Sequence, residues 1–324
     1  MQRSKPRILV TGAVGQIGSE LVPALRARYG SDNVIAAGHH KQPSPELLAA
    51  GPFEIVDVTK RESIEAAVVK HKIDTIYHLA AILSAVGEKN PQLAWDVNIN
   101  GMYYVLEVAR ERKLQRIFCP SSIAAFGPET PRDNTPQETV LRPRTMYGVT
   151  KVAGELLCDY YFQRFGVDVR GVRYPGIISN VTPPGGGTTD YAVEIFYEAI
   201  KFKRYNCFLR DDTVLPMMYM PDCLRGTMEL MEADLSKLKR HSDYNLAAFS
   251  FSPQELIAEI HKHIPDLACS FNPDFRQQIA DSWPRSLDDS AARQDWGWKP
   301  QYDLAGMVAD MIETLGKKHS EGKL

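Results

Sequence analysis

The sequence has 324 residues, of which 44% are hydrophobic and 24% charged, as in ordinary globular proteins. Its 38 basic and 40 acidic side chains leave a net charge of −2, which argues against nucleic acid or a membrane surface as a partner. No apolar run approaches the roughly 18 residues that cross a bilayer. The N-terminus lacks the apolar core of a secretory signal, so we expect a cytoplasmic protein that acts on a small molecule.

The cysteine pattern bears on metal chemistry. None of the five cysteines forms a CxxC pair or has the spacing of zinc ligands. We therefore expect reduced thiols and no metal site. The cysteines are Cys119, Cys158, Cys207, Cys223 and Cys269.

Strand-like and helix-like segments alternate through the first half of the chain. Short apolar strands are predicted at 7–11, 33–38, 53–57, 75–79, 116–120 and 167–173. Helices are predicted after the first strand to about residue 29, before residue 71, and over 96–112 and 146–165. This alternation predicts the α/β class, with a Rossmann-type doubly wound parallel sheet and helices on both of its faces.

The pattern changes near residue 178. The run Pro183-Pro-Gly-Gly-Gly187 breaks the chain, a helix is predicted over 191–203, and shorter elements follow. We expect a large first domain over 1–178 and a smaller, interleaved C-terminal domain over 179–324. A return to the main sheet is expected near 215–248.

The first predicted strand leads into a glycine-rich turn, Thr11-Gly-Ala-Val-Gly-Gln-Ile-Gly18. Glycines at three-residue spacing let the backbone turn tightly and approach a pyrophosphate, which the N-terminus of the following helix attracts. Between a strand and a helix, this turn predicts a dinucleotide site, which makes 1–178 a cofactor-binding domain. Its expected contacts are Gly12, Gly15, Gln16, Ile17 and Gly18.

The end of the second strand bears on the choice of cofactor. An NAD site usually places an acidic residue there to hold the ribose hydroxyls, but this chain has Gly38 followed by His39, His40 and Lys41. These basic residues suit the 2′-phosphate of NADP. Because no arginine stands there, we prefer loosely bound NAD and keep NADP open. Gly38 and His39 are expected to meet the cofactor in either case.

The ends of the next two strands complete the expected nucleotide site. Asp57 and Val58 follow the third strand and are placed to meet the adenine edge. Leu79, Ala80 and Ala81 follow the fourth strand and are placed to line the nucleotide.

A tyrosine and a lysine are four residues apart in Tyr147-Gly-Val-Thr-Lys151. On a helix these positions lie on one face, so the lysine charge favours the phenolate form of the tyrosine, as a general base needs. Ser122 follows a strand end, where doubly wound sheets place their ligands, and can orient a substrate oxygen. Asn98 is expected to help hold Lys151, through water or the backbone.

Together, the glycine-rich turn, Ser122, Tyr147 and Lys151 resemble the extended short-chain dehydrogenase/reductase superfamily. Longer strings resemble its L-threonine 3-dehydrogenase branch: 83–88, 143–151, 174–179, 184–191, 215–219 and 282–290. The resemblance covers nearly the whole chain. It implies that L-threonine and NAD are converted to 2-amino-3-ketobutyrate and NADH without metal, with Ser122, Tyr147 and Lys151 as catalytic residues.

The resemblance also implies further contacts and an assembly. Residues matching the substrate contacts of that branch are Ser84, Ser122, Tyr147 and Thr188. The turn at 185–188, with Gly186, is expected to supply backbone N–H groups for the substrate carboxylate, and Trp283 is expected to close over the site. Tyr174, Pro175 and Ile177 would flank the nicotinamide, while Asn98, Tyr147 and Lys151 would also meet the cofactor. The resemblance suggests a homodimer built on the helices near 96–112 and 146–165.

Two other functions remain open on the same scaffold. A nucleotide-sugar epimerase or dehydratase shares the serine, tyrosine and lysine, but it needs a basic groove for its diphosphate. The C-terminal half has only scattered arginines, at 204, 210 and 225. The second alternative is a non-catalytic regulator that senses dinucleotides, which has less use for an intact set of catalytic residues.

Overall fold

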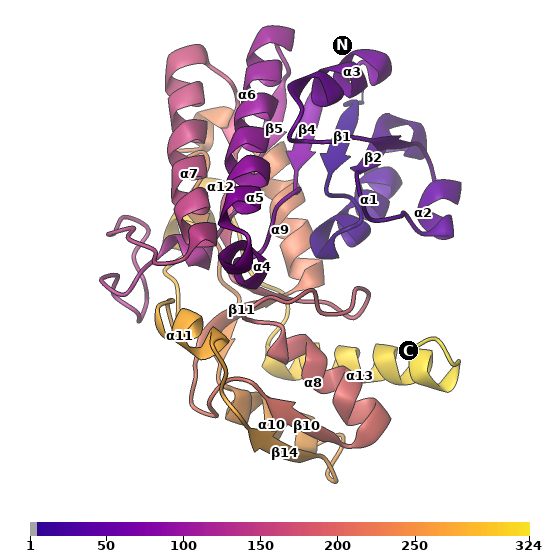
Figure 1. Ribbon diagram of the computed structural model, residues 1–324, viewed down its shortest axis with the longest axis vertical. Helices are drawn as coiled ribbons and strands as arrows, with labels where there is room; N and C mark the ends of the chain where they lie inside the picture. The colour runs from indigo at the N-terminus through magenta and orange to yellow at the C-terminus, as the bar shows by residue number, and fades with distance from the viewer. Residues whose placement is uncertain (1–4) are drawn as a thin grey trace.

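The structure is a computed structural model and describes residues 5–324. Its central feature is a six-stranded parallel sheet in the order β3-β2-β1-β4-β5-β7 (Figure 1). The chain starts at the middle of the sheet, winds to one edge, and then crosses back to build the other edge, as in Rossmann folds. The predicted α/β class and doubly wound parallel sheet are confirmed.

The elements of the first part follow the predicted alternation. They are β1 (Ile8–Thr11), α1 (Gln16–Tyr29), η1 (Ser31–Asn33), β2 (Val34–Gly38), α2 (Pro45–Ala49), β3 (Phe53–Ile55), α3 (Arg61–His71), β4 (Thr75–His78), α4 (Ser84–Lys89), α5 (Pro91–Trp95), η2 (Asp96–Asn100), α6 (Gly101–Arg112), β5 (Arg116–Phe118), β6 (Ser121–Ser122), η3 (Ile123–Ala125), α7 (Met146–Phe165), β7 (Val169–Arg170), β8 (Val172–Tyr174) and β9 (Gly176–Ile178).

Alternating side chains of the strands make two separate cores. In β1, Ile8 and Val10 are buried against α1 and α9 (Met220–Glu232) on one face of the sheet. Leu9 is buried against α3, α6 and α7 on the other face. The period of two along a strand therefore explains why helices cover both faces (Figure 1).

Two predicted elements are interrupted. The helix predicted over 96–112 begins with the π-helical turn η2, a feature often found at functional sites, before α6 continues it. The strand predicted over 167–173 is split at Gly171 into β7 and β8. A Cβ atom at Gly171 would lie 2.2 Å from the Cys119 carbonyl oxygen, so the backbone passes too close to its neighbour for any side chain.

Much of the C-terminal part packs into a core of its own below the sheet (Figure 1). Its elements are α8 (Tyr191–Phe202), β10 (Arg204–Cys207), β11 (Leu215–Tyr219), α9, η4 (Leu235–Lys237), β12 (Tyr244–Asn245), β13 (Phe249–Phe251), α10 (Pro253–His261), β14 (Ala268–Phe271), α11 (Arg276–Asp281), α12 (Ser290–Trp296) and α13 (Leu304–Ser320).

Strands of the C-terminal part pair with strands from the first part of the chain. Strand β11 pairs with β9 and β13, and β12 pairs with β8, which directly follows edge strand β7 of the main sheet. The division of the chain at residue 178 stays a prediction.

Candidate active site

A cavity opens at the carboxyl ends of the central strands, between the sheet and the C-terminal part. Its walls come from the glycine-rich turn, the segments after β4 and β5, the start of α7, the region of β9, and the loop before α8. The lining residues are Gly12, Gly15, Gln16, Ile17, Gly18, Leu79, Ala81, Leu83, Ser84, Pro120, Ser121, Ser122, Ile123, Tyr147, Lys151, Tyr174, Pro175, Gly176, Ile177, Gly187, Thr188, Thr189, Asp190 and Trp283.

The glycine-rich turn is shaped to hold an anion. Gly12 has a φ of +70°, and a Cβ there would lie 2.7 Å from the Ala80 nitrogen. A Cβ at Gly18 would lie 2.3 Å from the Gly12 carbonyl oxygen, so glycine is required for close packing of α1. Gly15 is the N-cap residue of α1, and because it has no side chain, no capping side chain occupies the first N–H groups of the helix. The N–H groups at the start of α1 are thus available to a pyrophosphate, and the turn fits a dinucleotide.

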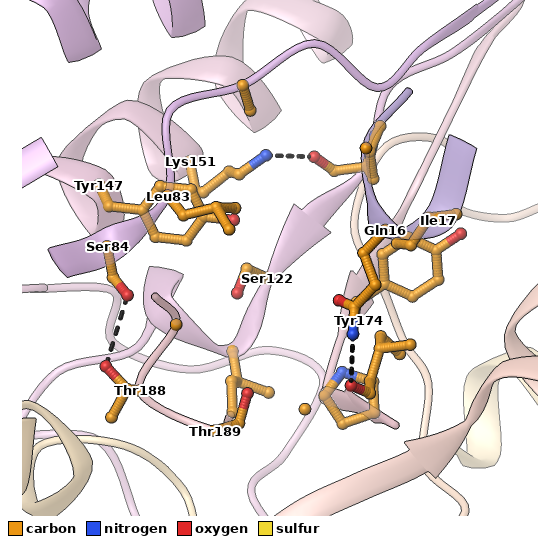
Figure 2. A pocket seen from close by; sticks show the side chains of 18 of the residues that line it. Gln16, Ile17, Leu83, Ser84, Ser122, Tyr147, Lys151, Tyr174, Thr188 and Thr189 are labelled. Carbon is orange, nitrogen blue, oxygen red and sulfur yellow. Dashed lines mark hydrogen bonds between the residues drawn. The ribbon is translucent and has the colours of Figure 1, made fainter. Parts of the chain in front are cut away.

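Tyr147 and Lys151 project from α7 into the cavity, and Ser122 lies across from them (Figure 2). The Lys151 ammonium lies 5.3 Å from the centre of the Tyr147 ring and donates a 2.8 Å hydrogen bond to the Pro120 carbonyl. The Ser122 hydroxyl oxygen accepts a 3.2 Å hydrogen bond from the Ala124 N–H, which leaves its own proton free to point toward a ligand.

Close packing fixes the start of α7 against the segment after Ser122. Thr145 caps the helix by accepting a hydrogen bond from the Gly148 N–H. A Cβ at Gly148 would lie 2.3 Å from the Ala124 carbonyl oxygen. The residue next to Tyr147 must therefore be glycine for the helix to approach Ser122 this closely.

A second wall carries small hydroxyl groups. The hydroxyls of Ser84, at the start of α4, and Thr188, before α8, lie 3.4 Å apart on one side of the cavity (Figure 2). Both residues are buried, as is Trp283, which lines the cavity and also packs into the C-terminal core. The structure thus brings Ser84, Thr188 and Trp283 together with Ser122 and Tyr147.

The glycine-rich loop at 185–187 behaves differently from its expected role. We expected its N–H groups to hold a substrate carboxylate. The N–H groups of Gly185, Gly186 and Gly187 instead donate to one carboxylate oxygen of Asp190, at 2.8, 2.7 and 2.8 Å. In this structure an internal anion occupies them, so that expectation is not met. Gly186, with a φ of +91°, lies outside the cavity lining, and Gly187 lines it.

The residues expected beside the nicotinamide do line the cavity. Gln16 reaches across from α1 and donates a 3.2 Å hydrogen bond to the Ile177 carbonyl, which ties the glycine-rich turn to β9 (Figure 2). The Tyr174 hydroxyl hydrogen-bonds Thr227, so this residue presents its ring to the cavity. Pro175 lines the same cavity.

The predicted adenosine contacts lie apart from this cavity. Gly38 ends β2, and Asp57 and Val58 follow β3, the edge neighbour of β2. His39 Nε2 lies 3.9 Å from an Asp57 carboxylate oxygen. Burial raises the pKa of Asp57, but hydrogen bonds from Thr59 and the charge of His39 outweigh burial and hold that pKa below its ordinary value.

Asn98 lines a small cavity together with Lys151, and its expected role in holding Lys151 through water or the backbone stays a prediction. Its side chain exchanges hydrogen bonds with the backbone of Ile82 and donates to the Thr150 hydroxyl at 3.1 Å. Among residues 5–324 it forms no direct hydrogen bond with Lys151, although Asn98, Ala80 and Lys151 all line a second, smaller cavity. The π-helical turn η2 directs Asn98 toward the segment after β4. We found no sequence pattern that predicts this turn.

A buried ion pair supports the catalytic face of α7. Glu155 lies one turn beyond Lys151, accepts a hydrogen bond from Ser121, and pairs with Arg173 of β8 at 2.7 and 2.9 Å. Burial raises the pKa of Glu155, and the Arg173 guanidinium opposes that rise. Arg173 also bonds Asp243, so the pair joins α7, β6, β8 and the C-terminal part.

Sequence reasoning missed several lining residues, including Leu83, Ile123, Thr189 and Asp190. Three of them lie within or beside the strings that carried the family resemblance, which was the available signal. Within the described chain, no three His, Cys, Asp or Glu side chains gather as a metal site. No helix over residues 5–324 is long and apolar enough to cross a membrane.

Comparison with known proteins places this site in a family. A family model described as the NAD dependent epimerase/dehydratase family matches residues 8–247. An uncharacterized epimerase/dehydratase from Staphylococcus haemolyticus is 52% identical over 313 residues, covering 96% of this chain and 98% of the relative.

Solved structures are similar over the whole chain. An L-threonine dehydrogenase from Clostridium difficile has 52% identity and a TM-score of 0.95, covering 98% of this chain and 99% of that one. A monomeric L-threonine 3-dehydrogenase from a metagenome database has 51% identity and a TM-score of 0.92, covering 96% and 99%. The resemblance to the threonine dehydrogenase branch is confirmed, and the chain belongs to the NAD dependent epimerase/dehydratase family.

Proposed function

We propose that this protein oxidises L-threonine at its side-chain hydroxyl to 2-amino-3-ketobutyrate, with NAD as the oxidant. The observation that carries the proposal is the convergence of Ser122, Tyr147 and Lys151 with Ser84 and Thr188 on one cavity (Figure 2). About half of the residues are identical to those of an L-threonine dehydrogenase. A nucleotide-sugar epimerase would use the same three catalytic residues, so the substrate has to be tested directly.

The roles of the residues follow from their positions. Tyr147 would accept the proton of the threonine hydroxyl, and Ser122 would donate a hydrogen bond to the same oxygen. Lys151 would hold the ribose of the dinucleotide and keep a positive charge beside Tyr147. NAD, held by the glycine-rich turn and Lys151, would supply the acceptor for the hydride of the carbon that bears the hydroxyl. Most of the acceleration would come from holding these groups in line in a water-poor cavity.

The other predicted contacts are part of this proposal. Ser84, Thr188, Trp283 and the loop at Gly186 would surround the amino acid. Gly12, Gly15, Gln16, Ile17 and Gly18 would hold the pyrophosphate, and Gly38, His39, Asp57 and Val58 the adenosine. Leu79, Ala80, Ala81, Asn98, Tyr174, Pro175 and Ile177 would enclose the rest of the cofactor. Cytoplasmic location stays a prediction.

An assay for NADH formation tests the function. L-Threonine, L-serine, L-allo-threonine, UDP-glucose and UDP-galactose are each offered with NAD. We expect turnover with L-threonine above all others. Epimerisation or dehydration of a UDP-sugar releases no net NADH, so the sugar nucleotides are also separated by chromatography. Conversion of a UDP-sugar in the absence of threonine turnover would favour the epimerase alternative. Dinucleotide binding with no turnover of any substrate would favour a regulator.

The cofactor preference rests on Gly38. A carboxylate there would accept hydrogen bonds from the ribose hydroxyls, worth about 1.5–3 kcal/mol for a charged partner, so Gly38→Asp is expected to tighten NAD by roughly ten- to a hundredfold. The new Cβ would lie 3.2 Å from the Phe53 ring and 3.4 Å from Val14, so Phe53 must move by a few tenths of an ångström. The same change should weaken NADP.

Dissociation constants for both cofactors, measured by fluorescence titration, check this expectation. Gly38→Asn is the matched control, because it has the same shape without the charge. If the wild type prefers NADP by a wide margin, then His39, His40 and Lys41 form a phosphate site and the NAD assignment fails.

Metal independence is the next expectation. The chemistry proposed for Tyr147 needs no Lewis acid, because a phenolate removes the proton directly. Dialysis against a strong chelator, followed by the threonine assay in chelated buffer, should leave the rate unchanged. A loss of activity that added zinc restores would contradict the mechanism.

We further propose a homodimer that joins α6 and α7 of two copies. These helices lie side by side on the outside of the molecule (Figure 1). Their outer faces carry apolar residues with large exposed fractions: 42% for Val149, 66% for Leu156, 53% for Tyr160 and 43% for Tyr103. Such a stripe is unusual on the surface of a monomer.

Light scattering at micromolar concentration tests the assembly. The wild type should have twice the mass of the chain, and Leu156→Glu should have the mass of one chain, because the dimer would bury the new charge. Leu48→Glu, at an equally apolar but distant exposed site on α2, is the control and should leave the dimer intact. A monomeric wild type, as in the metagenome relative, would refute this proposal.

A further inference from the structure

His78 is a buried polar side chain that the mechanism above does not use. It ends β4, is 3% exposed, and directly precedes the segment expected to line the nucleotide. Its Nδ1 atom lies 2.9 Å from the hydroxyl of Thr11, the first residue of the glycine-rich turn. Its Nε2 atom is buried and has no hydrogen-bond partner among residues 5–324. Buried polar atoms of this kind usually have a partner, protein or water.

His78 also lines a small cavity. This lysine cavity is lined by His78, Leu79, Ala80, Ala81, Asn98, Met102, Pro120, Thr150 and Lys151. Its volume of about 20 Å³ exceeds the roughly 10–15 Å³ that one water molecule needs. Lys151 lines both this cavity and the main one, so it is shared between the cavity that His78 lines and the proposed substrate site.

The charges on the two sides suit a bridging water. Burial and, to a smaller extent, the nearby Lys151 charge lower the pKa of His78 to about 3, so the imidazole is neutral at ordinary pH. In the tautomer with the proton on Nδ1, that N–H donates a hydrogen bond to the Thr11 hydroxyl, and Nε2 is an acceptor. The Lys151 ammonium has three N–H donors, and one of them is bonded to Pro120. A water can accept from Lys151 and donate to Nε2.

We propose that His78 is a positioning residue for the reaction: through one water in the lysine cavity, it holds the Lys151 ammonium at the distance from Tyr147 that catalysis needs. This inference rests on the proposed function for its consequence in catalysis. The bridge itself is a structural claim that stands apart from the substrate. It would connect the glycine-rich turn, through Thr11 and His78, to the catalytic helix.

The surroundings of Lys151 leave His78 as the natural anchor on this side. On α7 itself, the titratable neighbours are Tyr147, one turn before, and Glu155, one turn after, which already pairs with Arg173. Cys119 and Cys158 line an adjoining small cavity with Lys151 and Glu155. Hydrogen bonding with Cys119 and burial raise the pKa of the Cys158 thiol, so it stays neutral. Among the residues that line the lysine cavity, His78 is thus the one titratable side chain besides Lys151, and its Nε2 atom is an acceptor without a partner among residues 5–324.

Two substitutions separate the bridge from the packing of His78. The change His78→Asn would keep a polar atom near the Nδ1 position, toward Thr11, but the shorter side chain has no atom that reaches the cavity. The change His78→Gln would place its terminal amide near the Nε2 position. We expect His78→Asn to lower kcat with threonine about tenfold or more, the usual effect of losing a hydrogen bond that serves a charged group. His78→Gln should stay within about threefold of the wild type.

The pH profile distinguishes positioning from simple damage to the fold. In His78→Asn the acid limb of kcat should move to higher pH, because a displaced Lys151 no longer favours the phenolate, whereas His78→Gln should keep the wild-type limb. His71→Asn, at the partly buried end of α3 and outside the lining of both cavities, is the control and should change neither quantity. Equal losses in both His78 variants, with unshifted limbs, would overturn the proposal.

A crystal structure of the wild-type enzyme provides a test that needs no activity. We expect one ordered water within hydrogen-bond distance of both His78 Nε2 and Lys151 Nζ. A lysine cavity with no ordered water would refute the bridge even if both variants fail to fold. If the water is present but threonine is not oxidised, the proposed function fails while the bridge survives.

Discussion

Tyr147→Phe should lower turnover with threonine by about 10²–10⁴-fold, the usual contribution of a positioned general base. Phenylalanine fills the same space beside Lys151 but has no oxygen to accept the threonine proton. Because the ring and the backbone of α7 stay in place, the variant should fold normally and bind NAD with nearly unchanged affinity. Steady-state kinetics and a fluorescence titration with NAD measure the two quantities.

Tyr160→Phe is the matched control for this prediction. Tyr160 lies on the same helix with 53% of its surface exposed, and it does not line the cavity. Removing its hydroxyl should leave kcat unchanged. Near-full activity in Tyr147→Phe would remove this residue from the role of base.

The largest effect on stability is expected from Arg173→Met. Arg173 is 2% exposed, and its removal leaves the Glu155 carboxylate buried without its cation, which usually costs about 3–5 kcal/mol. Urea denaturation followed by circular dichroism measures the loss of unfolding free energy. Arg112→Met is the control, because Arg112 pairs with Glu65 on the surface, where such pairs contribute about 0–1 kcal/mol.

The pH dependence gives this second prediction a distinct signature. Burial already raises the pKa of Glu155, and loss of Arg173 should raise it further. A carboxyl group with a raised pKa in the folded state destabilises the protein fully above that pKa, and the penalty fades as pH falls toward the unfolded value. The deficit of Arg173→Met relative to wild type should therefore shrink on acidification. A deficit independent of pH would show that Glu155 is not the source.

The parts of the fold that depend on local pattern were predictable. The alternation of apolar strands and amphipathic helices predicted most elements before residue 178 to within about two residues, including α7 over Met146–Phe165. Its bounds are marked locally, by the Thr145 cap and by Gly166 in the left-handed conformation. The glycine-rich turn could also be predicted from the sequence, because its function depends on residues that are adjacent in the chain.

Features that depend on distant contacts were not predictable. At the break, Gly171 passes too close to the Cys119 carbonyl to carry a side chain, and turn η2 is accompanied by hydrogen bonds between Asn98 and Ile82. The Asp190 carboxylate accepts hydrogen bonds from the N–H groups of the loop at 185–187, which were expected to bind the substrate. Likewise, nothing near His78 in the sequence indicates that it lines a cavity together with Lys151. These contacts join residues that are far apart in the sequence, so they form only when the sheet and its helices have assembled.

Hydride transfer from L-threonine deuterated at C3 tests the central claim most directly. The enzyme is mixed with NAD and this substrate, and the dinucleotide product is analysed by mass spectrometry. We predict reduced cofactor that carries one deuterium, with 2-amino-3-ketobutyrate, or the aminoacetone formed from it, as the other product. Absence of reduced cofactor, or reduced cofactor without the label, would contradict oxidation of threonine at its side-chain hydroxyl.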